Sequence, residues 1–365
     1  MPVTRSGPPG GADDVGDPPS VVLVTGVSRF LGGNLAARLA ADPRIDRVVG
    51  VDTVPPPRDM LRRMGRAEFV RADIRNPLIA KVISGAGVDT VVHAALSSGP
   101  GQSGGRTAMK EMNVIGTMQL LAACQKAETV RRVVLKSTTA VYGSGSRDPA
   151  LFDESMTPKD LPSGGYAKDA AEIEGYLRGF ARRRPDVTTT VLRFCNYVGP
   201  RIDTVMTRYF ALHVVPTVLG FDARLQFLHE EDALAVLERA ATHDLPGVFN
   251  VAADGVLMLS QAIRRAGQIQ VGVPSLAVGP VGRLLRGARI VDYSPEQMRF
   301  LNFGRVVDTT RLKEGFGFAP RWTTVQAFDD YVRGRALRPV LGRGRLEAAE
   351  RTVLAAARAV PKVLG

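Results

Sequence analysis

A glycine-containing turn near the start of the chain has the residue types that bind phosphate. Residues 25–32 read Thr-Gly-Val-Ser-Arg-Phe-Leu-Gly and lie between a β-branched run and a helical pattern. In such a turn the first glycine permits the tight bend, the second lets the backbone approach a pyrophosphate, and the third lets the helix pack on the strand. Gly26 and Gly32 fit the first and third roles, whereas Arg29 stands at the middle position. The helix that follows would point its free N–H groups at the phosphates.

A carboxylate placed one strand further on strengthens this interpretation. Asp52 ends a strand twenty residues after Gly32, where its oxygens can accept hydrogen bonds from ribose hydroxyls. Because a carboxylate would repel a 2′-phosphate, the pattern favours NAD over NADP. An ordinary turn with a capping aspartate is the simpler alternative. The expected cofactor contacts in this part of the chain are Gly26, Arg29, Phe30, Leu31, Gly32 and Asp52.

Short apolar runs alternate with helical segments through the first half of the chain. We expect strands at 21–25, 47–52, 67–71, 89–93, 131–136 and 188–193, and helices at 30–39, 107–126 and 166–183. Alternation of this kind predicts an α/β, Rossmann-type doubly wound parallel sheet. After residue 193 the pattern becomes irregular, which predicts a smaller C-terminal substrate lobe. The predicted divisions are a disordered leader at 1–19, an NAD-binding Rossmann domain at 20–193, a substrate lobe at 194–335 interleaved with the last sheet elements, and a basic tail at 336–365.

The charge of the chain is concentrated at its end. The 365 residues carry a net charge of +12, and residues 333–365 supply half of it with eight basic and two acidic side chains. The sequence lacks an aromatic–basic motif or a recognition helix, so we expect no nucleic-acid binding. An apolar stripe between Leu346 and Val360, flanked by Arg351 and Arg358, leaves weak contact with a membrane surface open. A packed or solvated tail is the alternative.

The remaining composition predicts a cytoplasmic protein with a hydrophobic core. Hydrophobic residues make up 45% of the chain, and no run approaches the ~18 apolar residues of a membrane span. Residues 1–19 have no apolar region of the kind found in a signal peptide. Cys124 and Cys195 lie in apolar runs, which predicts buried, reduced thiols. We found no metal-ligand spacing and expect no metal site.

Several further motifs follow the first turn in order. They lie at 71–75, 92–95, 113–117, 137–143, 192–200 and 308–312. Together they resemble the extended short-chain dehydrogenase/reductase family, the NAD-dependent epimerase/dehydratases, which includes nucleotide-sugar 4-epimerases. The resemblance runs from Val21 to about Arg333. It implies NAD contacts from Asp73, Ile74, Ala94, Ala95 and Asn113, a substrate diphosphate contact from Asn196, and pairing into a homodimer; for Asn196 a structural turn residue is the alternative.

The resemblance also implies a catalytic group of Ser or Thr, Tyr, and a Lys four residues after the Tyr. The phenol acts as general acid/base, and the ammonium lowers its pKa and binds the nicotinamide ribose. Thr138 and Tyr166 match this pattern, but position 170 is Ala. Lys168 lies about 200° round the helix from Tyr166 and is a poor substitute. Lys136 shares a strand face with Thr138, although a solvated or ion-paired lysine is the simpler interpretation.

Two functions follow from the resemblance. The first is an NAD-dependent epimerase, dehydratase or reductase acting on a nucleotide sugar, similar to UDP-glucose 4-epimerase, in which Tyr166 removes a hydroxyl proton and Thr138 polarises the oxygen. The second is a catalytically degenerate relative that binds a dinucleotide as a sensor, scaffold or partner subunit. Arg29 either binds the pyrophosphate or obstructs NAD. Whether the chain turns over a substrate stays open at this point.

Overall fold

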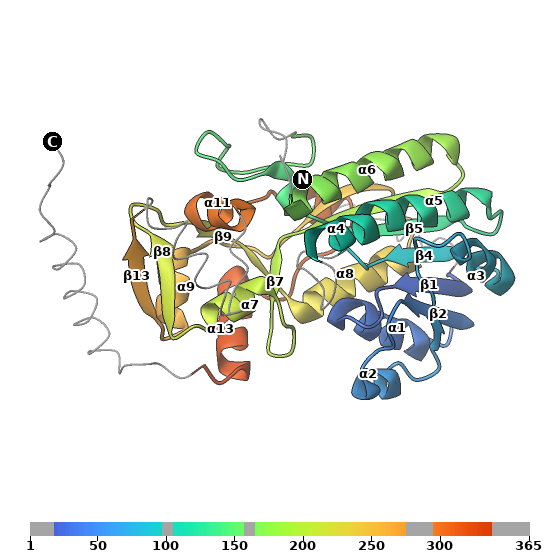
Figure 1. Ribbon diagram of the computed structural model, residues 1–365, viewed down its shortest axis with the longest axis horizontal. Coiled ribbons are helices and arrows are strands. Elements are labelled where there is room, and N and C mark those ends of the chain that lie inside the picture. The colour runs from blue at the N-terminus through green and yellow to red at the C-terminus, as the bar shows by residue number, and fades with distance from the viewer. Residues whose placement is uncertain (1–17, 97–104, 157–164, 275–294, 338–365) are drawn as a thin grey trace, which may run out of the picture.

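A seven-stranded parallel sheet forms the centre of the computed structural model (Figure 1). The structure describes residues 18–96, 105–156, 165–274 and 295–337. Most of the predicted leader, most of the predicted tail and residues 97–104 of a Gly/Ser-rich loop lie outside these ranges. The strand order is β11-β6-β5-β4-β1-β2-β3, with β1 at Val21–Thr25, β2 at Arg47–Asp52, β3 at Glu68–Arg71, β4 at Thr90–His93, β5 at Arg132–Thr138, β6 at Thr188–Phe194 and β11 at Gly247–Val251. The predicted doubly wound sheet is confirmed.

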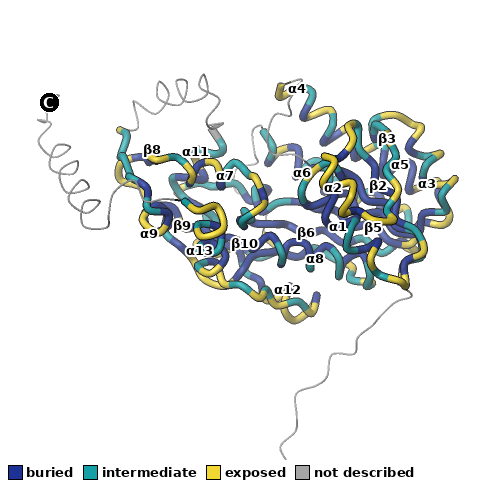
Figure 2. Tube along the Cα trace, turned by 90° about the horizontal axis from the view of Figure 1, so that it is seen from below, coloured by how far each residue is buried: buried dark blue, intermediate teal, exposed yellow. Residues whose placement is uncertain are grey.

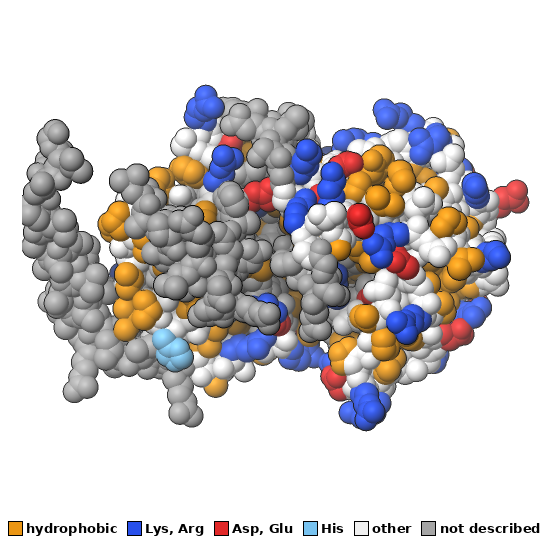
Figure 3. Space-filling model, viewed as in Figure 1, with side chains coloured by type: hydrophobic (Ala, Val, Ile, Leu, Met, Phe, Trp, Pro, Cys, Tyr) orange, Lys and Arg blue, Asp and Glu red, His pale blue; other side chains and the backbone are white. Residues whose placement is uncertain are grey.

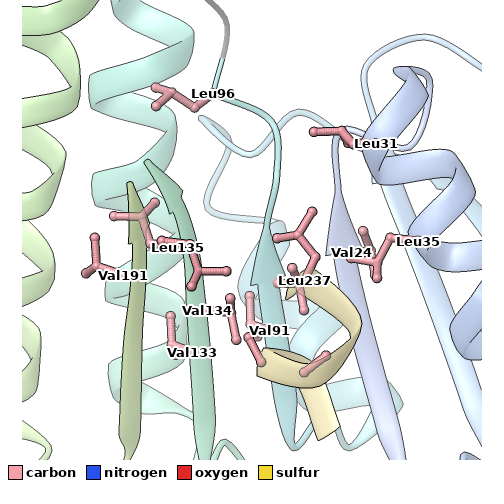
Figure 4. Close-up of a cluster of buried hydrophobic side chains, with 14 of the residues drawn as sticks. Val24, Leu31, Leu35, Val91, Leu96, Val133, Val134, Leu135, Val191 and Leu237 are labelled. Atoms are coloured by element: carbon pink, nitrogen blue, oxygen red, sulfur yellow. The ribbon is translucent and has the colours of Figure 1, made fainter. Parts of the chain in front are cut away.

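Helices cover both faces of this sheet, which is why its strands are almost continuously apolar. The helices α1 (Phe30–Ala41) and α8 (Glu230–Thr242) pack on one face, whereas α3 (Ile79–Ala86), α5 (Gly116–Lys126) and α6 (Gly165–Arg183) cover the other (Figure 1). Figure 4 shows Leu35 of α1 and Leu237 of α8 beside Val24, Val91 and Val134 of the central strands. The central strands are accordingly buried, whereas exposed residues lie on the helices, in the loops and at the ends of outer strands such as β3 (Figure 2).

The strand order reverses between β1 and β4, and this reversal determines where a ligand can bind. From β1 the chain winds outwards to β2 and β3, and it then returns to β4 on the other side of β1. The loops that follow β1 and β4 therefore leave the sheet in opposite directions and open a crevice at the carboxyl edge. The glycine-containing turn follows β1, and Ala94 and Ala95 follow β4.

Several elements differ from the sequence prediction. The helix expected at 107–126 is divided into α4 (Gly105–Lys110), a π-helical turn at Glu111–Ile115 and α5. The strand expected to end at residue 136 continues to Thr138. The short helices α2 (Arg58–Arg63) and α3 were not predicted, because segments of six and eight residues carry little periodicity. The strand β11, distant in sequence, completes the sheet beside β6.

A smaller C-terminal lobe packs around a second apolar cluster, as expected. Its rings include Phe210, Phe227 and Phe328, with centroids 4.9–5.9 Å apart. Its strands are β7 (Asn196–Val198), β8 (Val214–Val218), β9 (Arg224–Leu225), β10 (Phe227–His229), β12 (Leu257–Met258), β13 (Ile269–Val273) and β14 (Gly304–Arg305). Its helices are α7 (Val205–Phe210), α9 (Leu259–Arg265), α11 (Pro295–Phe303) and α13 (Thr324–Gly334). The helix α12 (Thr310–Glu314) instead packs on β11, and its Leu312 belongs to the main core. Among the described helices, none is long and apolar enough to cross a membrane.

A buried ion pair fastens α6 to the sheet. Arg193 of β6 and Glu174 of α6 approach to 2.7 Å, and their side chains are 10% and 3% exposed. The Ser137 hydroxyl of β5 donates to the same carboxylate at 2.5 Å. Arg193 also donates to the Tyr142 hydroxyl at 2.8 Å, and Tyr142 donates to Asn250 of β11 at 2.8 Å. One polar cluster therefore connects α6 with three strands.

The change Glu174→Gln should destabilise the fold strongly. It preserves the shape of the side chain but leaves the buried guanidinium of Arg193 without a carboxylate, a loss that costs about 3–5 kcal/mol. The free energy of unfolding, measured by urea titration, should fall by that amount. Glu172→Gln is the matched control, because Glu172 lies on the same helix, is half-buried, and has Tyr176 as its hydrogen-bond partner among the described residues. Similar losses in both variants would contradict this assignment.

Candidate active site

The turn after β1 requires glycine at two positions. Gly26 has a φ of 78°, and a Cβ there would lie 2.8 Å from the Cα of Ala95. A Cβ on Gly32 would lie 2.3 Å from the carbonyl oxygen of Gly26. Within the described residues, no side chain caps the start of α1, and the N–H groups of Phe30, Leu31 and Gly32 have no protein acceptor. This helix end therefore presents free donors at the crevice.

Arg29 lies across the crevice. Its backbone is extended, at φ −101° and ψ 160°, and its exposed side chain donates from Nη1 to the carbonyl oxygen of Ala95 at 3.0 Å. The guanidinium thus bridges the loops that follow β1 and β4. Because the side chain is exposed and hydrogen-bonded to one acceptor among the described residues, its other N–H groups can bind an anion in the crevice.

Acidic residues line the far side of the turn. Asp52 accepts hydrogen bonds from the backbone N–H and hydroxyl of Ser28 and from the N–H of Thr53. Asp73, in the loop after β3, pairs with Arg75 at 2.6 Å, and the hydrogen bonds from Arg75 hold the pKa of Asp73 below its ordinary value. Ile74 is 4% exposed and packs against Gly116. These residues surround the β2–β3 side of the crevice.

A chain of buried polar groups runs beneath the crevice. The ring of His93 contacts the hydroxyls of Thr25 and Thr117 at 2.8 Å each. The Thr117 hydroxyl donates to the carbonyl of Asn113, whose amide donates to Asp169 of α6 at 3.1 Å. Asn113 is 1% exposed, and the π-helical turn directs it inwards. In this structure it positions α6 against α5.

Thr138 and Tyr166 meet at the wall of a cavity of about 440 Å³. A hydrogen bond joins their side chains, and Asn196 and Tyr197 of β7 line the same cavity. Burial raises the pKa of Tyr166 far above its ordinary value, and the Tyr197 phenol adds to the rise. The bond from Thr138 and the charge of Arg29 act in the opposite direction. The three residues predicted to act on a substrate are therefore together.

The cavity wall has more positive than negative side chains. Its described lining has five basic residues, Arg106, Lys136, Arg147, Arg299 and Arg305, against Asp148 and Glu296. Figure 3 shows Lys and Arg side chains gathered near the middle of one face, where Figure 1 places α4 and the start of α6. Burial lowers the pKa of Arg305 to about 10, which still leaves it charged near neutral pH. The cavity is therefore suited to an anion.

The lysine positions near Tyr166 have different environments. Ala170 is completely buried in the main core. Lys168 is exposed and does not line the cavity, in agreement with its expected direction on α6. Lys136 is 4% exposed and does line it. The expectation that Lys136 is solvated or ion-paired is therefore not met among the described residues.

Comparison with known sequences identifies the family. A sequence model of the NAD dependent epimerase/dehydratase family matches residues 22–252, which is more than half of the chain. The chain belongs to this family. It is 57% identical over 332 residues to an uncharacterised protein of Mycobacterium tuberculosis, covering 91% of this chain and 88% of the relative. It is 26% identical over 187 residues to a probable UDP-arabinose 4-epimerase of Oryza sativa, covering 49% and 45%.

Solved structures of epimerases share the fold. The UDP-glucose 4-epimerase of Thermotoga maritima with UDP-glucose aligns with a TM-score of 0.65 at 20% identity, covering 86% of this chain and 98% of that structure. The UDP-glucuronic acid 4-epimerase of Bacillus cereus with UDP-glucuronic acid and NAD aligns with a TM-score of 0.67 at 18% identity, covering 87% and 99%.

Both cysteines of the chain, Cys124 and Cys195, are buried and free, as expected.

Sequence reasoning missed the charged groups around the start of α6. Arg106 binds both carboxylate oxygens of Asp169 at 2.6 Å and donates to the carbonyl of Gly165. Glu296 of α11 accepts the N–H of Ala167, and burial raises its pKa. The partners lie 63 and 129 residues apart, so no local pattern connects them. An Asp on the buried side of the Tyr166 helix is the one signal that could have prompted a search for a cation.

His93 should make stability depend on pH. Burial lowers its pKa in the folded chain to about 3, against an ordinary value of 6.5. Because the unfolded chain binds more protons between these values, the contribution of neutral His93 is complete above pH 6.5 and is lost as the pH falls towards 3. His93→Asn should be less stable than the native chain at neutral pH, and the difference should shrink by roughly 1.4 kcal/mol per pH unit. Urea titrations at several pH values test this.

The exposed His213 provides the control. His213→Asn should follow the native chain at every pH. A constant difference between His93→Asn and the native chain below pH 6.5 would contradict the assignment of His93 as a neutral buried group.

Proposed function

We propose that this chain binds NAD along the carboxyl edge of the sheet and acts as an epimerase or dehydratase on a nucleotide sugar. The observation that carries the proposal is the meeting of Thr138, Tyr166 and Asn196 at one cavity with an excess of positive charge. The cavity volume of about 440 Å³ falls within the range of small-molecule sites. A nucleoside diphosphate sugar is anionic and carries hydroxyls, and the cavity offers partners for both. Relatives and structural neighbours with this fold are named as UDP-sugar epimerases.

The residues of the crevice fit a dinucleotide. The free N–H groups at the start of α1 suit a pyrophosphate, and Gly26 and Gly32 let the backbone close tightly around the turn. Asp52 lies where it can accept ribose hydroxyls, and Asp73 and Ile74 lie further along the same edge. Ala94 and Ala95 lack bulky side chains at the end of β4. These residues would hold NAD, and the chemistry that NAD would supply there is reversible hydride transfer.

The protein's own residues would manage the substrate proton. Tyr166, as phenolate, takes the proton of a substrate hydroxyl, and as phenol it returns it. Thr138 holds the phenol by a hydrogen bond and polarises the same substrate oxygen. Asn196 would donate a hydrogen bond to the diphosphate, and the arginines of the cavity would bind it through charge-assisted hydrogen bonds.

A second function is favoured by one observation. Position 170 is a buried Ala, so the lysine expected beside Tyr166 is absent from α6. A protein that binds NAD and a nucleotide sugar without turnover, as a sensor, scaffold or partner subunit, would have this feature. Calorimetric titration with NAD and then nucleotide sugars, followed by product analysis, separates the two functions. Binding without product would favour the second, and no NAD binding would eliminate both.

Tyr166→Phe should abolish turnover while leaving NAD binding intact. The change removes the acid–base oxygen and nothing else, so kcat should fall by about 10²–10⁴. Product formation from UDP-glucose, followed by chromatography, measures the loss. Tyr176→Phe is the control, because this phenol lies on the same helix, outside the cavity, and binds Glu172. Equal activities of the two variants would exclude Tyr166 from the reaction.

Arg29→Gln should weaken NAD binding. If the guanidinium binds the pyrophosphate, charge-assisted hydrogen bonds worth about 1.5–3 kcal/mol are lost, so Kd should rise about tenfold or more and depend less on salt. Arg62→Gln removes one exposed charge from the same domain and should leave Kd unchanged. Tighter binding by Arg29→Gln would instead show that Arg29 obstructs the cofactor.

A further inference from the structure

Lys136 is a buried cation at the cavity wall without a carboxylate partner among the described residues. Its Nζ donates to the carbonyl oxygen of Leu96 at 3.3 Å and lies 5.9 Å from the centre of the Tyr197 ring. An ammonium has three donors, and a carbonyl and a ring do not neutralise its charge. Burying an unpaired charge costs free energy. A negative charge in the cavity would offset this cost.

The ammonium and the Tyr166 phenol line the same cavity. Lys136 and Thr138 are two residues apart on β5 and share one face of the strand. Thr138 is hydrogen-bonded to Tyr166. Tyr197 is near both groups, because its ring centre lies 5.9 Å from the ammonium and its phenol raises the pKa of Tyr166. All four side chains line the same cavity.

The other charged groups around this cavity differ from Lys136 in pairing or exposure. Arg305 is a second buried cation, but it donates to the Gly143 carbonyl and the Ser144 hydroxyl, and the charges of Asp148 and Glu296 act on it. His93, on which the charge of Lys136 acts, is a neutral ring at neutral pH.

Arg29 lowers the pKa of Tyr166, but its side chain is exposed and donates to Ala95, so solvent weakens this effect. Arg106 is neutralised by the buried Asp169 of the same helix as the phenol. Glu296, which reaches the start of that helix from α11, has the opposite sign. Burial makes the phenol hard to ionise, so a nearby unscreened cation would have a large effect.

We propose that Lys136 supplies the positive charge that lets Tyr166 exchange a proton with a substrate hydroxyl, in place of the lysine absent at position 170. The inference rests on the proposed function. The O–H bond of the substrate breaks as the O–H bond of Tyr166 forms, and the ammonium lowers the free energy of the phenolate form relative to the phenol. Lys136 acts through Tyr166 and is therefore a positioning residue.

Lys136→Met is the first test. Loss of the cation should raise the pKa of Tyr166 by about one unit, so turnover near neutral pH should fall about tenfold and recover as the pH rises. Because Met replaces an unpaired buried charge, the unfolding midpoint should stay the same or rise. Lys168→Met, which removes an exposed lysine two residues after Tyr166, should change neither quantity. An unchanged pH profile in Lys136→Met would overturn the proposal.

Moving the charge is the second test. In the double variant K136A/A170K the ammonium is transferred to α6, one turn after Tyr166 on the same face. Turnover near neutral pH should exceed that of Lys136→Ala alone by about tenfold, and Lys136→Arg should retain the native pH profile. If the turnover of Lys136→Ala falls only in proportion to its free energy of unfolding, and neither K136A/A170K nor Lys136→Arg restores turnover, Lys136 has a structural role.

A third measurement does not need turnover. The tyrosinate absorbance that disappears with Tyr166→Phe reports the pH at which Tyr166 begins to ionise in an alkaline titration of the folded chain. This pH should be higher in Lys136→Met than in the native chain, and unchanged in Lys168→Met. Tyrosinate from Tyr166 that appears at the same pH in Lys136→Met and the native chain would overturn the role of Lys136. A higher pH in a protein that turns over no nucleotide sugar would instead overturn the proposed function alone.

Discussion

Arg193 and Glu174 form an ion pair almost completely out of water, and the position of Tyr166 depends on it. The pair connects α6 to β6, while Ser137, Tyr142 and Asn250 join the same polar cluster from β5, its following turn and β11. Since a buried pair is stable only when its hydrogen-bonding groups are satisfied, these elements cannot shift independently. The helix that carries Tyr166 is thereby held in register with the strand that carries Thr138.

Two cations meet the loop that follows β4. Arg29 and Lys136 donate to consecutive carbonyl groups, those of Ala95 and Leu96. Two positive charges are therefore fixed at the same edge of the crevice. The Arg29 guanidinium is exposed to solvent, whereas the Lys136 ammonium is buried. The two charges therefore act with different strength on a buried phenol, because solvent screens the first more than the second.

Much of the sheet could be predicted because parallel strands buried on both faces are apolar throughout. The apolar runs around Val24, Val49 and Val134 predicted strands for this reason. The π-helical turn could not be predicted, because the insertion that turns Asn113 inwards leaves no change in local composition. The same holds for β11, whose pairing with β6 is a contact between segments distant in sequence. Short helices such as α2 lack enough turns to show periodicity.

The sequence by itself determined the parts of the site that depend on neighbours along the chain. Gly26 and Gly32 are required by the geometry of a single turn, and Thr138 and Tyr166 belong to short motifs on one strand and one helix. Only the tertiary structure decided which charges surround the phenol. The burial of Lys136 and the pairing of Arg106 with Asp169 depend on packing between distant segments. Electrostatic effects depend on distance and solvent exposure, and the order of residues contains neither.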